Sequence, residues 1–100
     1  MELTVLAVPD CPNAPLLRQR LDEVLAWRSA PDIAWHVVAD AAEAERLGMH
    51  GSPTLLVDGV DPFAEPGQPT SLSCRLFRDA HGALSGLPST DQLRRALHGA

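Results

Sequence analysis

Residues 46–59 read RLGMHGSPTLLVDG, in which a glycine, a proline and an apolar run follow one another. Gly48 is typical of the residue that follows a helix, so a short helix should end there. The apolar run that begins at Thr54 predicts a buried strand, 54–59, which ends in an Asp-Gly turn signal. Pro53 lies between the two elements. The stretch therefore predicts a helix, a turn fixed by proline and a buried strand in immediate succession.

Outward from this stretch, the chain alternates strands and helices. We expect, in order, a strand at 3–8, a helix from Asn13 to Arg28, a strand at 33–39, a helix opened by a capping box of Asp40 and Glu43, the strand at 54–59, a return strand at 73–78, and a helix capped by Ser89 with Gln92 that runs to Leu97. The first three elements should form a right-handed parallel crossover. The expected fold class is α/β, with a mixed sheet of about four strands, in a single domain that spans residues 1–100.

Composition excludes several classes of function. The formal charge is −5 and no basic run occurs, which argues against nucleic acid as a partner. No apolar run is long enough for a membrane helix, so we expect a soluble, cytoplasmic protein with its two cysteines reduced. All eight basic residues are arginine, which excludes Schiff-base and Walker-type lysine chemistry. The bias toward arginine, alanine and proline indicates a GC-rich, bacterial genome.

Cys11 lies in the stretch DCPNAP, residues 10–15, between the first expected strand and the first expected helix. Free amides and the positive end of the helix dipole at such a position favour the thiolate, which is the reactive form of cysteine. Asp10 acts in the opposite direction, because its negative charge disfavours a neighbouring thiolate. Cys11 is therefore a candidate nucleophile or soft-metal ligand, and a cysteine without any reaction is the alternative.

The segments DCPNA and RLGMHGSPTLLVDG, in this order, resemble the thioredoxin superfamily, and the resemblance covers nearly the whole chain. More narrowly, CPN, GSPTLLVDG and LSCRLFR resemble small thioredoxin-like proteins grouped with organomercurial (alkylmercury) lyases. The resemblance implies a three-layer sandwich in which a cis-Pro53 faces Cys11. Ala14 stands where disulfide-exchanging members carry a second cysteine, and Val5 stands at about the position of the family's buried carboxylate.

Three classes of function follow from these residues. In the first, the chain is a monothiol oxidoreductase: Cys11 reacts, Ser52, Pro53 and Thr54 bind an extended thiol substrate, and Cys74 or an external thiol completes the reaction. In the second, Cys11 with or without Cys74 binds a soft metal or organomercurial ion. In the third, the chain is a non-catalytic interaction module. The expected partner is a thiol-containing protein or small molecule, no cofactor is expected, and whether the chain is an enzyme stays open.

The position of Cys74 decides between one-thiol and two-thiol chemistry. Cys74 alternates with Leu72 and Leu76, which favours a buried strand cysteine. In a simple hairpin the return strand begins at the far end of strand 54–59, about 15 Å from Cys11. The Pro-rich connection VDPFAEPGQPT, 60–70, leaves a second route open, because it could carry the chain back toward Cys11. We expect Cys74 to be buried and unpaired.

The two tryptophans are the last expectation. Trp27 and Trp35 should pack between a helix and the sheet, because large apolar side chains dominate such interfaces.

Overall fold

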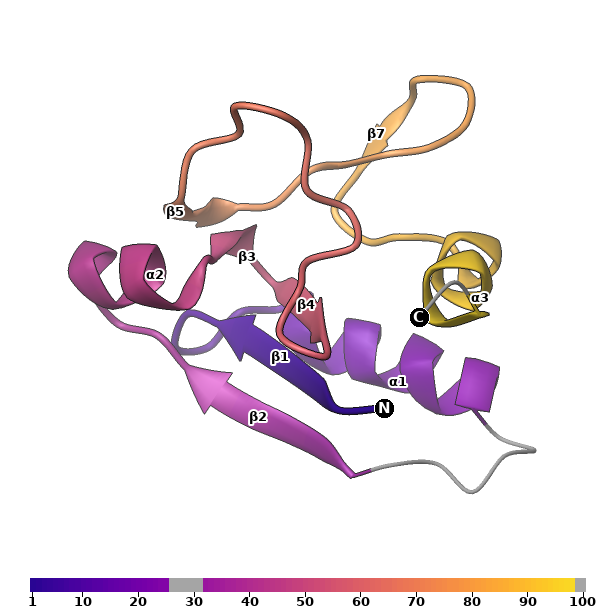
Figure 1. The fold of residues 1–100 in the computed structure, drawn as a ribbon, viewed down its shortest axis with the longest axis horizontal. Coiled ribbons are helices and arrows are strands. Elements are labelled where there is room, and N and C mark those ends of the chain that lie inside the picture. The colour runs from indigo at the N-terminus through magenta and orange to yellow at the C-terminus, as the bar shows by residue number, and fades with distance from the viewer. Residues whose placement is uncertain (26–31, 99–100) are drawn as a thin grey trace.

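The structure is a computed structural model of the chain, and it describes residues 1–25 and 32–98. Figure 1 shows their arrangement. The elements are, in order, β1 (Leu3–Ala7), α1 (Ala14–Leu25), β2 (Ile33–Val37), α2 (Ala41–Leu47), β3 (His50–Ser52), β4 (Thr54–Val57), β5 (Ser71–Cys74), β6 (Phe77–Arg78), β7 (Leu84–Ser85) and α3 (Thr90–His98). The α/β class is confirmed. Arg28 and Trp27, for which helical structure and packing were predicted, lie outside the described residues.

The main sheet is mixed and has the strand order β2-β1-β4 among the described strands. β1 pairs in parallel with β2, with Leu3 opposite Ile33, and antiparallel with β4, with Leu3 opposite Val57. The expected parallel pair of the first two strands is therefore confirmed. The expectation of about four strands was wrong for this sheet, because β3 pairs with β5 and β6 pairs with β7 in two separate two-stranded sheets.

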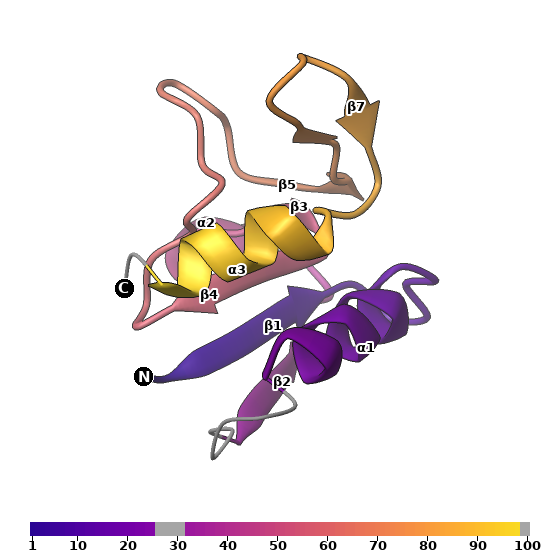
Figure 2. The same ribbon diagram turned by 90° about the vertical axis from the view of Figure 1, so that its right-hand side faces the viewer.

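The core lies on both faces of β1, as alternation of side chains along a strand requires. On one face, Leu3 and Val5 pack in a buried cluster with α1 and α3, to which α3 contributes Leu93 and Leu97. On the other face, Leu6 packs in a second cluster that includes residues of α2 and β5. In Figure 2, α1 and α3 are seen with the sheet beside them. Each fully buried leucine contributes roughly 1.5–3 kcal/mol of transfer free energy, so these clusters hold β1 at the centre of the domain.

The helix ends follow the capping signals in the sequence. α2 begins after Asp40, whose side chain accepts a hydrogen bond from the Glu43 amide at 2.8 Å, and it ends at Gly48, which has a left-handed φ of 74°. α3 begins after Ser89, and both bonds of the Ser89–Gln92 capping box form, at 2.8 and 3.1 Å. The predicted caps of these two helices are confirmed.

The chain after β4 departs from the simple hairpin that was expected. Asp58 and Gly59 both have positive φ and form the predicted tight turn, which is closed by hydrogen bonds between Val57 and Val60. The turn leads into the connection 60–70 instead of a long return strand. The expected strand at 73–78 was wrong: the chain forms β5, which pairs in parallel with β3, and then β6, which pairs with β7.

Candidate functional site

Cys11 lies in a turn that joins β1 to α1. The Cys11 amide donates a hydrogen bond to the Val8 carbonyl at 3.3 Å, and Asp10 adopts a left-handed φ of 59° inside this turn. The Leu17 amide donates to the Asn13 carbonyl, so regular helical bonding begins two residues after Cys11. Cys11 is half-buried. The first turn of α1 contains no acidic residue. A partly exposed thiol therefore lies just before the amides of a helix start.

The Ser52–Pro53 peptide bond is cis, which confirms the prediction for this bond. The segment meets the carboxyl end of β1, because the Ser52 hydroxyl accepts a hydrogen bond from the Val8 amide at 3.0 Å. Val8 also supplies the carbonyl that binds the Cys11 amide. One residue thus links the turn of Cys11 to the segment that contains Pro53.

The residues expected to bind substrate are turned into the fold. Ser52 and Thr54 are buried, at 3% and 0% exposure, and Pro53 is fully buried. The Thr54 hydroxyl donates to the Gly51 carbonyl at 2.6 Å and accepts from the His50 amide. Their side chains pack inside the protein, and a substrate contact by these three residues stays a prediction.

Cys74 is exposed, so the prediction of a buried cysteine was wrong. The connection 60–70 carries the chain back to β3. β5 then runs parallel to β3, with Cys74 in register with Ser52. The Arg75 amide extends this pairing with a hydrogen bond to the Ser52 carbonyl at 3.0 Å. Cys74 is thus placed beside the segment that contacts Val8, not at the far end of β4. Both cysteines are free thiols.

The close approach of β5 to β3 depends on Gly51. Its φ is 118°, a value that residues with a side chain rarely adopt. A Cβ atom at this position would lie 3.1 Å from the Arg75 Cα and from the Ser73 carbonyl oxygen. Glycine therefore allows the two strands to pack backbone against backbone next to Ser52.

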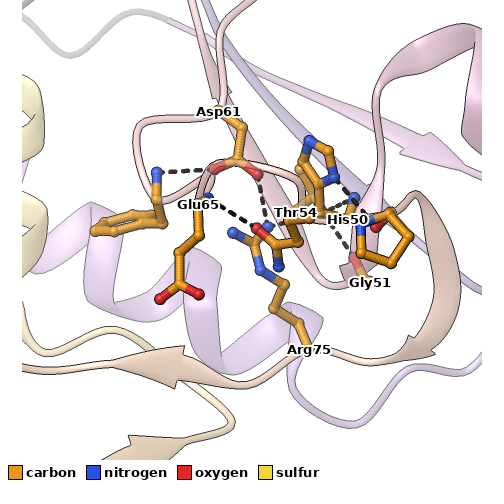
Figure 3. Close-up of polar contacts among 9 residues, drawn as sticks. His50, Gly51, Thr54, Asp61, Glu65 and Arg75 are labelled. Atoms are coloured by element: carbon orange, nitrogen blue, oxygen red, sulfur yellow. Dashed lines mark hydrogen bonds and ion pairs between the residues drawn. The ribbon is translucent and has the colours of Figure 1, made fainter. Parts of the chain in front are cut away.

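Arg75 is a buried cation that the sequence did not indicate. Its side chain is 1% exposed and donates to the Asp61 carboxylate at 2.7 Å, while the Asp61 side chain is 4% exposed. A second bond reaches the Thr54 hydroxyl at 3.2 Å, and the guanidinium lies 4.7 Å from the ring centroid of Phe77. Figure 3 shows Arg75 between Asp61 and Thr54. This cluster ties the connection 60–70 to the segment that contains Pro53.

A surface hollow of about 490 Å³ lies elsewhere, between α1 and β2. Its lining includes Pro15, Arg18 and Trp35, but neither cysteine. Trp35 is 40% exposed and lies beneath the Arg18 guanidinium, 5.9 Å from the ring centroid. Trp35 thus lies against α1, as expected, but it is not enclosed there, because β2 is an edge strand among the described strands.

Residues 1–25 and 32–98 contain no group of three or more His, Cys, Asp or Glu side chains placed to hold a metal ion. Over the same residues, every helix is too short or too polar to cross a bilayer. For a soft metal, the described residues offer Cys11 and Cys74 without a third ligand of these types.

Comparison with known proteins finds no match for this chain among family models, curated proteins or solved structures.

Proposed function

We propose that this chain is a thioredoxin-like protein that carries out thiol–disulfide exchange, with Cys11 as the one thiol at the start of α1. The observation that carries the proposal is the position of Cys11: a partly exposed thiol, in the turn before α1, linked through Val8 to the segment of cis-Pro53. The sheet adds support, since β1 lies between a parallel and an antiparallel neighbour and leads directly into the turn of Cys11. A reducing compartment such as the cytoplasm, where thiols stay free, suits this chemistry.

The proposed reaction begins with the thiolate of Cys11. The thiolate attacks one sulfur of a substrate disulfide, a bond forms between that sulfur and Cys11 Sγ, and the other half of the substrate leaves as a thiolate. Cys11 precedes the N-terminus of α1, and the positive end of the helix dipole there favours negative charge on the reacting sulfur. Ala14 is the first residue of α1, so the helix itself offers no second thiol to release the mixed disulfide.

Mixed-disulfide formation tests this proposal. The reduced chain is incubated with oxidised glutathione, quenched with acid at a series of times, and examined by mass spectrometry of its peptides. We expect glutathione to appear first on the peptide that contains Cys11, and the Cys11→Ser variant to lose this early reaction. The Cys74→Ser variant is the matched control, because it removes the other thiol and should keep the reaction at Cys11. Reaction at Cys11 no faster than that of free cysteine would contradict the proposal.

A further inference from the structure

Cys74 and Ser52 occupy matching positions on neighbouring strands. They are register partners in the parallel pair of β3 and β5, which lie alongside each other in Figure 1. The pairing contains a register irregularity between His50 and Ser52, of the kind that redirects side chains. Side chains of register partners stand on the same face of a sheet. The thiol of Cys74 therefore stands on the face to which the Ser52 hydroxyl points.

The Ser52 hydroxyl points to the end of β1. Its oxygen is 3.0 Å from the Val8 amide, and the Val8 carbonyl binds the Cys11 amide at 3.3 Å. Leu72, also in β5, packs on the buried cluster that Val8 contacts. Two independent sets of contacts thus hold β3 and β5 beside the end of β1 that leads into the turn of Cys11.

We infer that Cys74 is the resolving thiol for Cys11, an inference that rests on the proposed function. After Cys11 forms a mixed disulfide with one half of a substrate disulfide, the thiolate of Cys74 attacks Cys11 Sγ. The bond between Cys11 and the substrate sulfur breaks, the substrate half leaves as a thiolate, and a Cys11–Cys74 disulfide forms. Cys74 is exposed, so solvent takes its proton. The two thiols supply two electrons, the substrate disulfide accepts them, and an external dithiol restores the reduced chain.

The bond requires the Cα atoms of Cys11 and Cys74 to come within about 7 Å. Position along β5 should therefore matter, and the neighbouring residue provides a matched control. Ser73 is also exposed, but it points to the opposite face of β5. Moving the thiol by one residue, with Cys74→Ser and Ser73→Cys together, keeps the number of cysteines and changes only the face.

The experiment uses the full reduced chain, its Cys74→Ser variant and the relocated variant, each treated with oxidised glutathione. For the unaltered chain we expect a product lighter by two hydrogens, with a rate independent of protein concentration and with both thiols protected from alkylation. The two variants should instead accumulate the glutathione adduct on Cys11.

Three results would overturn the inference. If the glutathione adduct on Cys11 persists in the unaltered chain as it does in Cys74→Ser, the inference is wrong but the proposed function is not affected. Equal intramolecular disulfide formation in the relocated variant would show that the face of β5 is irrelevant. Absence of any reaction at Cys11 in all three proteins would instead refute the proposed function, and the inference with it.

Discussion

Replacing Asp61 by asparagine should destabilise the protein strongly. The change keeps the shape of the side chain and the oxygen that accepts the Phe63 amide, but it removes the charge that faces Arg75. The side chain of Arg75 is 1% exposed, so water cannot solvate its charge when the carboxylate is removed. Its Nε already lacks a hydrogen-bond partner. Removing one partner of a buried ion pair costs about 3–5 kcal/mol, which is a large part of the roughly 5–15 kcal/mol that stabilises a typical domain.

The matched control is the exposed pair of Arg78 and Glu65. Their side chains are 53% and 54% exposed at an N–O distance of 3.2 Å, so Glu65→Gln should cost at most about 1 kcal/mol. Urea denaturation followed by circular dichroism measures both free energies of unfolding, with an unchanged m-value as the check on two-state behaviour. Adding Arg75→Met to Asp61→Asn should recover stability, because no unpaired charge is left inside. Equal losses for Asp61→Asn and Glu65→Gln would refute the reasoning.

Three further predictions address other parts of the fold. Gly51→Ala should lower the free energy of unfolding by more than Gly48→Ala in urea denaturation, because only at residue 51 would the new Cβ meet backbone atoms; equal losses would contradict this. Leu93→Ala should cost about 2–5 kcal/mol in the same assay, since Leu93 is fully buried, while Leu76→Ala, at 57% exposure, should cost far less. Hydrogen bonds from backbone amides of its turn lower the pKa of Asp79, so its contribution to stability is complete above the unfolded-state pKa and is lost as pH falls through the lower folded value. NMR titration of those amides should therefore show a midpoint below that of an ordinary aspartate. A midpoint at or above the ordinary value would contradict this prediction.

Local signals predicted the parts of the fold that local interactions determine. The caps at Asp40 and Ser89 and the turn at Asp58 depend on residues adjacent in sequence, and the structure confirms each of them. The cis bond before Pro53, which is also confirmed, was expected from the family resemblance. The apolar runs likewise identified β1 and β4, because both strands are largely buried.

Pairings over long separations were not predictable in the same way. The segment around Cys74 was expected to continue as one strand to residue 78, but β5 is short, half polar and held by contacts with β3 and with α2. The burial of Arg75 depends on Asp61, which the chain supplies only through the path of the connection 60–70. No periodicity in the sequence specifies that path, and the relation of Cys74 to Ser52 depends on it.

The turn between β6 and β7 is a site at which this domain should tolerate inserted residues. It is closed by bonds between Asp79, Gly82 and Ala83, and the described residues from 78 to 85 are exposed, whereas the buried Phe77 lies before the turn. Figure 1 shows β7 far from β1 and β2. Exposed loop tips with local hydrogen bonding tolerate insertions best. A reporter peptide placed between Ala80 and Gly82 should therefore leave both cysteines and the core in their native positions.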